Sequence, residues 1–255
     1  MGDGSIAADL FAAVFSFGVC QLVIAFFKLT YDLALIHIHL YRKLIHISAG
    51  LIVMLCWPMF STYSGFMRLQ TTCSRTYYSK GTPTYQASTK IPRFQVNFPL
   101  LHFGYIPLVC NSGSPSISRD LVQATLAYVL SIAFTTVFYW RTPLAIAVIC
   151  SLCAGDGVAD IAGRRFGGSK LPYNKSKTFA GSFGMALAAF LASLLYMYYF
   201  SWLEYIEIEA TPNMVLGFFL VSVASALVES FPFSPTLDDN LTVPLASFML
   251  ATFLL

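Results

Sequence analysis

Asp156 and Asp160 are the two acids whose spacing could do chemistry. They stand four residues apart, so in a helix both carboxylates lie on one face and could hold a single divalent cation. Magnesium is usually held by one or two carboxylates together with the phosphates of a nucleotide. The alternative is that both acids only cap a helix or pair with neighbouring cations.

Five cations and four glycines lie among and after these acids. Cations beside a metal site suit a triphosphate, because its charge must be neutralised for phosphoryl transfer. Glycines would let the backbone approach a phosphate closely. The alternative for the cations is a loop that only fixes orientation in a membrane. The cations are Arg164, Arg165, Lys170, Lys175 and Lys177, and the glycines are Gly163, Gly167, Gly168 and Gly181.

The composition places this stretch in a membrane protein. Of 255 residues, 57% are hydrophobic and only 11% are charged, whereas a soluble domain carries about a quarter charged residues. The sequence therefore predicts an all-α, multi-pass transmembrane helical bundle, formed by a single domain over residues 1–255. The net charge of +3 is small and its cations lie between apolar runs, which favours topology and anionic ligands over nucleic acid. Ionisable groups at membrane depth are costly and usually functional, so Asp156 and Asp160 favour a site.

Apolar runs mark the elements that must position these residues, because a span needs about 20 apolar residues. The run at 144–154 is short and is expected to deliver Asp156 at the membrane surface or just inside it. Residues 61–120 contain no clear span, and so long a connection without one is unusual. The other expected spans are 6–27, 44–60, 121–140, 178–200, 214–228 and 241–255, the last being short.

These spans carry a prediction about topology. If residues 61–120 cross nowhere, three spans separate Arg42 from the loop at 164–177. The two would then lie on opposite faces of the membrane, and one site could not use both. A further crossing in the segment would restore them to one face.

Cys150 and Cys153 form a CxxC pair, which can indicate a metal or redox site. No second pair accompanies them, and they stand at the end of an apolar run. We predict that they are buried thiols.

Two sequence stretches resemble the polyprenol kinase family, and within it the plant farnesol kinase and phytol kinase branch. They read GDGVADIAGRRFG at 155–167 and KLPYNKSKTFAGS at 170–182. Further likeness comes from RKLIHISAG at 42–50, ESFP at 229–232 and LDDN at 237–240. The resemblance covers 42–60 and 128–250, whereas 61–123 departs from the family. The central stretches are also similar to those of phosphatidate cytidylyltransferases, which use CTP and magnesium.

The resemblance implies an enzyme that phosphorylates a prenyl alcohol such as farnesol, geranylgeraniol or phytol, with CTP or another nucleoside triphosphate as donor. It implies Mg²⁺ as cofactor, the lipid bilayer as setting and a plastid membrane as location. The metal ligands would be Asp156 and Asp160, with Glu229 and Asp239 as further catalytic acids. The nucleotide-binding residues would be Arg42, Lys43, His46, Arg164, Arg165, Lys170, Asn174, Lys175 and Lys177.

Two alternatives remain open. A cytidylyltransferase would transfer CMP to an acidic lipid and release pyrophosphate, whereas a CTP-dependent kinase releases CDP. The divergent 61–120 segment raises the other alternative, a catalytically impaired isoform that acts only as a membrane interaction protein.

Overall fold

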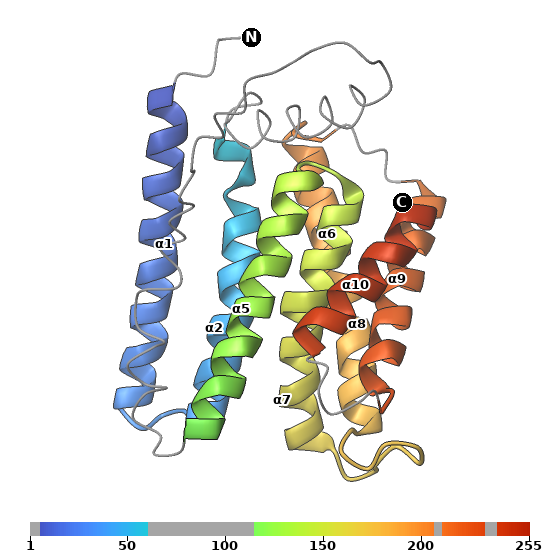
Figure 1. Ribbon diagram of the computed structural model, residues 1–255. Helices are drawn as coiled ribbons and strands as arrows, with labels where there is room; N and C mark the ends of the chain where they lie inside the picture. Colours follow the sequence, from blue (N-terminus) through green and yellow to red (C-terminus); the bar gives the residue numbers. More distant parts are fainter. Residues whose placement is uncertain (1–5, 61–114, 207–210, 233–238) are drawn as a thin grey trace, which may run out of the picture.

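The computed structural model describes residues 6–60, 115–206, 211–232 and 239–255. Over these residues the chain is a bundle of helices (Figure 1), and its strand content is a single isolated bridge between Lys170 and Thr178. Five helices in the described part of the chain are long and apolar enough to cross a membrane. The predicted all-α multi-pass bundle is confirmed.

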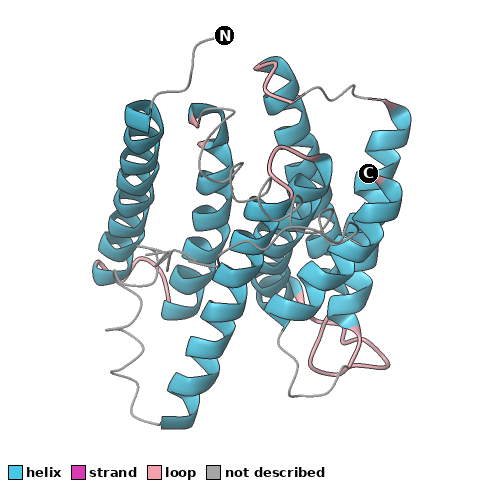
Figure 2. Ribbon diagram, turned by 45° about the horizontal axis from the view of Figure 1, so that its top comes forward, coloured by secondary structure: helices cyan, strands magenta, loops and turns pink. Residues whose placement is uncertain are grey.

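The α-helices are α1 (Ile6–Asp32), α2 (Ile38–Leu55), α5 (Pro115–Phe138), α6 (Pro143–Cys150), α7 (Asp156–Phe166), α8 (Phe179–Trp202), α9 (Pro212–Ser230) and α10 (Asp239–Leu254). Short stretches of other helix types lie among them, namely a 3₁₀ turn, η1 (Trp57–Met59), and a π-helical turn, η3 (Ser151–Gly155). Most consecutive helices run in opposite directions (Figures 1 and 2), but α5 runs in the same direction as α2, and α7 continues the direction of α6.

The centre of the bundle is the continuous helical path α6–η3–α7, which runs from Pro143 to Phe166. Residues Leu144–Cys150 are all buried, because α2, α8 and α10 pack around this path. A helix that is apolar on every side belongs in such a core. The predicted C-terminal end of the short span at 144–154 was therefore wrong. The helix continues beyond Gly155 and carries both Asp156 and Asp160.

Other predicted boundaries shift less. The first span extends to Asp32, and α2 begins at Ile38 instead of residue 44. The helix α2 ends at Leu55, and Pro58 lies within the 3₁₀ turn η1 that follows it. Residues 61–114 of the divergent segment lie outside the described residues, and α5 already begins at Pro115.

Glycines bring α7 and α8 into close contact. A Cβ atom on Gly181 would come 3.0 Å from the carbonyl oxygen of Ala159, and one on Gly163 would come 3.1 Å from Thr178 Oγ1. Small residues allow such close helix packing in membranes. Gly163 and Gly181 therefore join two helices, which is a different role from the phosphate approach that the sequence indicated.

Of the two placements that the sequence left open, the structure shows the one in which Arg42 and the 164–177 loop lie on the same face. The start of α2 and the loop between α7 and α8 lie at the same end of the bundle, at the bottom of Figure 1. The ammonium of Lys43 reaches the carboxylate of Asp156 at 2.8 Å. The end of α2 and the beginning of α5 lie at opposite ends of the bundle, so the order of the described helices returns both charged segments to one face.

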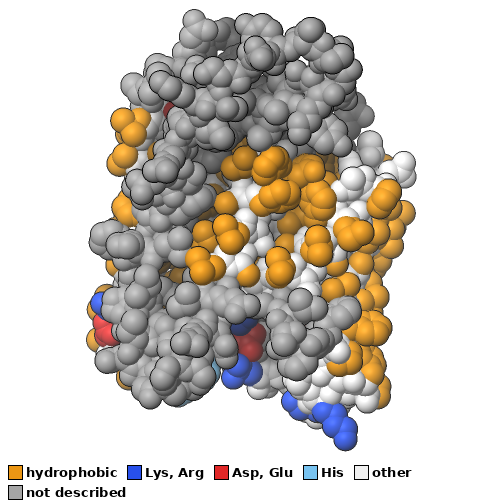
Figure 3. Space-filling view, viewed as in Figure 1, with side chains coloured by type: hydrophobic (Ala, Val, Ile, Leu, Met, Phe, Trp, Pro, Cys, Tyr) orange, Lys and Arg blue, Asp and Glu red, His pale blue; other side chains and the backbone are white. Residues whose placement is uncertain are grey.

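The surface agrees with a membrane setting. Large apolar side chains cover the middle height of the bundle in Figure 3, and Lys and Arg side chains gather at its lower end. On α1 the outward residues include Leu10, Phe11 and Leu22, each more than half exposed. Lipid tails would cover these side chains.

Candidate functional site

Asp156, the first residue of α7, is the centre of the charged end of the bundle. Its Oδ2 atom lies 2.8 Å from Lys43 Nζ and 3.3 Å from His46 Nε2. Lys43 and His46 lie one turn apart on α2, so this helix presents both to the same carboxylate. The sequence placed all three in a site, and the structure brings them together.

The π-helical turn η3 directs these contacts. The amide of Asp156 donates to the carbonyl oxygens of Ser151 and Cys153, whereas an α-helix would direct it to Leu152. The carbonyl of Leu152 accepts from His46 Nε2 at 3.2 Å. Both oxygens near Nε2 are acceptors, so this nitrogen carries the hydrogen. Such π turns are frequent at functional sites.

Because Asp156 is buried, its negative charge must be balanced by nearby groups. The residue is only 8% exposed, and a buried carboxylate needs a paired cation and hydrogen bonds. Lys43 and His46 both bind Oδ2, while no side chain among the described residues donates to Oδ1. One carboxylate oxygen is thus left for a ligand.

Asp160 lies one turn further along α7 and is more exposed. Its Oδ1 accepts from Arg164 Nε at 2.9 Å, an i,i+4 pair at the surface, and such pairs contribute little stability. Within the described ranges no group of three or more His, Cys, Asp and Glu side chains could hold a metal. Asp156 and Asp160 therefore fit a Mg²⁺ ion only if phosphates and water complete its coordination.

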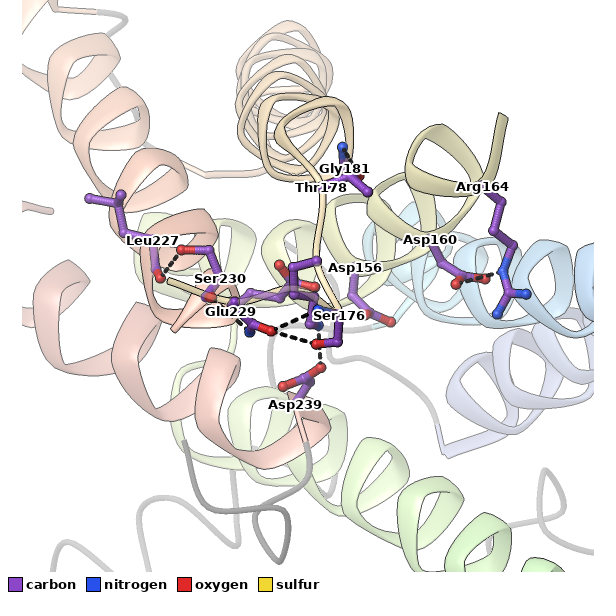
Figure 4. A network of polar contacts seen from close by, with 12 residues as sticks. Asp156, Asp160, Arg164, Ser176, Thr178, Gly181, Leu227, Glu229, Ser230 and Asp239 are labelled. Atoms are coloured by element: carbon purple, nitrogen blue, oxygen red, sulfur yellow. Dashed lines mark hydrogen bonds and ion pairs between the residues drawn. The ribbon is translucent and has the colours of Figure 1, made fainter. Parts of the chain in front are cut away.

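Lys177 forms a second ionic cluster with Glu229 and Asp239, and Figure 4 shows these two acids near Asp156. The Lys177 ammonium contacts Glu229 Oε1 at the end of α9 and lies 2.7 Å from Asp239 Oδ2 at the start of α10. Burial alone would lower the pKa of Lys177, but these carboxylates outweigh it and hold the pKa above its ordinary value. Lys177 also interacts electrostatically with Asp156. We therefore treat the two clusters as one candidate site.

Hydrogen bonds hold the loop between α7 and α8 in the position that places Lys177 beside Glu229 and Asp239. Asn174 Nδ2 donates to the carbonyl of Ser230 at 3.0 Å, and the hydroxyl of Tyr173 lies 2.9 Å from Ser230 Oγ. The amide of Leu171 donates to the carbonyl of Lys177 at 3.1 Å, and Leu171 is buried. The amide of Asn174, predicted to bind a nucleotide, thus anchors the loop to α9.

The remaining predicted cations lie further out. Arg165, Lys170 and Lys175 are exposed and make no ion pair with other described side chains. Arg42 is partly buried on α2. Arg165, Lys170 and Lys175 can attract an anion to the charged end but do not by themselves fix its position.

Sequence reasoning missed three participants. Tyr128 on α5 donates its hydroxyl to the carbonyl of His46 at 2.7 Å. Tyr173 and Ser230 hold the loop, and Ser230 follows directly after Glu229. Tyr173 and Ser230 lie within the stretches that resemble the family, whereas nothing in the sequence singled out Tyr128. Cys150 and Cys153 are buried free thiols, as predicted.

Comparison with proteins of known function finds plant relatives along most of the chain. It is 47% identical to "Farnesol kinase, chloroplastic" of Arabidopsis thaliana, over 85% of this chain and 65% of that protein. It is 42% identical to "Probable phytol kinase 3, chloroplastic" of Glycine max, over 98% and 74%. It is 36% identical to "Phytol kinase 1, chloroplastic" of Arabidopsis thaliana, over 92% and 72%. The chain thus spans 65% of the first relative's length. No protein-family model and no solved structure matches it.

Proposed function

Because the chain belongs to the family of plant farnesol and phytol kinases, we propose that it transfers a phosphoryl group from a nucleoside triphosphate to the hydroxyl of a prenyl alcohol. Farnesol, geranylgeraniol and phytol are the acceptors to test. The observation that carries the proposal is the conjunction of this family with a charged site at one end of an apolar bundle. The resemblance read from residues 155–182 is confirmed at the level of the family.

The acceptor's chemistry suits this geometry. A prenyl chain dissolves among lipid tails, while its hydroxyl remains near the headgroups. The exposed apolar faces of the helices provide the first environment, and the charged end provides the second. Such a protein would act as one membrane domain over residues 1–255, and the names of the relatives support a plastid membrane.

The proposed donor is CTP, held with Mg²⁺. Asp156 and Asp160 each use one carboxylate oxygen in an ion pair and retain the other, so together they would hold Mg²⁺, which supplies positive charge for the donor phosphates. Arg42, Lys43 and Lys177 would bind phosphate oxygens at the base of the site. The outer cations Arg164, Arg165, Lys170 and Lys175 would steer and neutralise the triphosphate.

Glu229 and Asp239 are the proposed proton acceptors. As the alcohol oxygen forms its bond to the γ-phosphorus, the bond to the nucleoside diphosphate breaks and the hydroxyl proton moves to a carboxylate. Lys177 contacts both carboxylates and so aligns them. His46 holds Asp156 in place through Nε2.

The test is turnover by the full chain in membranes. The three alcohols are supplied with each nucleoside triphosphate, and both products are identified, with Asp156→Asn as the control. We expect a prenyl monophosphate and CDP. Release of pyrophosphate in place of CDP would instead indicate the cytidylyltransferase, and absence of turnover above the control would indicate the impaired isoform.

A further inference from the structure

The hydroxyl of Tyr128 lies where three elements of the bundle meet. It donates to the carbonyl of His46 on α2 at 2.7 Å and lies 3.3 Å from Cys153 Sγ in η3. The Tyr128 ring packs against the His46 imidazole with centroids 4.0 Å apart. Tyr128 itself is buried, so water does not compete for these contacts.

Gly50 makes this junction possible. A Cβ atom at this position would stand 2.2 Å from Cys153 Sγ and 2.9 Å from the Tyr128 oxygen. Any side chain here would push both groups away from α2. The backbone of α2 is thus open to Tyr128 one turn beyond His46.

The contacts of Tyr128 continue through His46 to the site. Nε2 of His46 donates between Leu152 O at 3.2 Å and Asp156 Oδ2 at 3.3 Å. A rotation of the imidazole would lose both contacts. The Tyr128 ring opposes that rotation by packing on the imidazole, and its hydroxyl fixes the backbone from which the imidazole extends.

We propose that Tyr128 is a positioning residue of the phosphoryl transfer, acting through His46 on the carboxylate of Asp156. This inference rests on the proposed function. It also gives α5 a direct connection to the site, although α5 supplies no charged group to the ionic clusters among the described residues.

Tyr196 supplies a matched control. It is a buried tyrosine on α8 whose hydroxyl donates to the carbonyl of Leu51 on the same helix α2, at 2.6 Å, and it makes no contact with His46 or Asp156. Tyr128→Phe and Tyr196→Phe each remove one buried hydroxyl bonded to α2. A purely structural role predicts equal effects of the two substitutions.

The experiment measures kcat, KM and thermal unfolding for the full chain in detergent or lipid, with kcat expressed per folded enzyme. Tyr128→Phe is expected to lower kcat about tenfold, the scale of one neutral hydrogen bond, while KM for the alcohol is unchanged. Tyr196→Phe is expected to keep the wild-type kcat. In a His46→Gln background, Tyr128→Phe should have no further effect, because the residue through which it acts is gone.

A wild-type kcat in Tyr128→Phe, or an equal loss in the His46→Gln background, would overturn the role of Tyr128 alone. A fall in kcat that Tyr196→Phe reproduces would overturn it as well. A wild-type chain without turnover refutes the proposed function and this inference with it, so the two failures are distinguishable.

Discussion

The two ends of the bundle are built from different interactions. The charged end joins helices through ion pairs, from Lys43 to Asp156 and from Lys177 to Glu229. The opposite end, at the top of Figure 1, joins them through aromatic rings. There the Trp57 and Trp140 rings lie 4.8 Å apart, Trp57 stacks on Phe200 at 5.8 Å, and Arg141 lies over Tyr205 at 3.9 Å.

This difference indicates that the charged end is suited to catalysis and the aromatic end to holding the fold. An ion pair can be exchanged for a ligand of the same charge, so phosphates can replace the carboxylate partners of Lys43 and Lys177. Buried rings have no such substitute, since their stabilisation comes from packing. The charged end is therefore suited to changing its partners during turnover, while the aromatic end is suited to holding the helices in place.

The largest expected effect is on activity at the charged end. Asp156→Asn keeps the shape of the side chain but removes the charge that pairs with Lys43. We expect kcat/KM to fall by roughly three orders of magnitude, the scale for a preorganised electrostatic group. The assay is prenyl phosphate formation per folded enzyme. Retention of a tenth of the activity would contradict the central role of Asp156.

The next effect is on stability at the aromatic end. Trp57→Ala removes a side chain that is 1% exposed, and we expect the free energy of unfolding to fall by about 3–5 kcal/mol. The kcat of the remaining folded enzyme should stay near wild type. Trp202→Ala is the control, because that side chain is 79% exposed. A selective loss of kcat in Trp57→Ala would contradict the assignment of catalysis to the charged end and of stability to the aromatic end.

Lys177→Met tests both properties at once. It leaves Glu229 buried without its cation, and we expect a loss of about 2 kcal/mol, below the value for a fully buried pair because Lys177 is partly exposed. The KM for the nucleotide should rise in parallel. Lys175→Met removes an exposed neighbour and should change stability by less than about 0.5 kcal/mol. Similar effects of the two substitutions would show that the carboxylates of Glu229 and Asp239 do not depend on Lys177.

The same lysine predicts a pH dependence. Its pKa is raised in the folded protein, so its contribution is complete below the ordinary lysine pKa and is lost as pH rises through the raised value. The difference in unfolding free energy between wild type and Lys177→Met should therefore be constant from neutral pH to about pH 10 and shrink above it. Denaturant titrations at a series of pH values measure it, and a difference that grows in alkali would be inconsistent with this ion cluster.

The smallest effect on stability is expected at Asp160. Asp160→Asn breaks an exposed pair with Arg164 and should change the unfolding free energy by less than about 0.5 kcal/mol. Activity should nevertheless fall, by about tenfold, because one of two proposed metal ligands is lost. The Mg²⁺ concentration needed for half-maximal activity should rise. A stability loss as large as that of Lys177→Met would contradict the ranking by burial.

The helices and the residue types of the site could be predicted from the sequence, but few of the contacts between them could. Long apolar runs and the Asp156–Asp160 spacing report on local periodicity, and both were informative. The end of the central helix was predicted wrongly because Gly155 and Gly157 are typical of loops, whereas packing in the core keeps them helical. The Lys43 contact with Asp156 spans 113 positions, and no local pattern encodes such a distance. The turn η3 depends on packing that spacing alone does not specify.

The close approach of α7 and α8 at Gly163 and Gly181 has a mechanical consequence. Because the two helices approach so closely at these glycines, rotation of either helix would bring its side chains against the other, and we expect the two to move together. Compliance at the charged end must then come from the short connection between them, from Gly167 to Thr178. Tyr173 and Asn174 hold that connection through their hydrogen bonds to Ser230. The strength of these bonds would set how readily the loop moves when an anion binds.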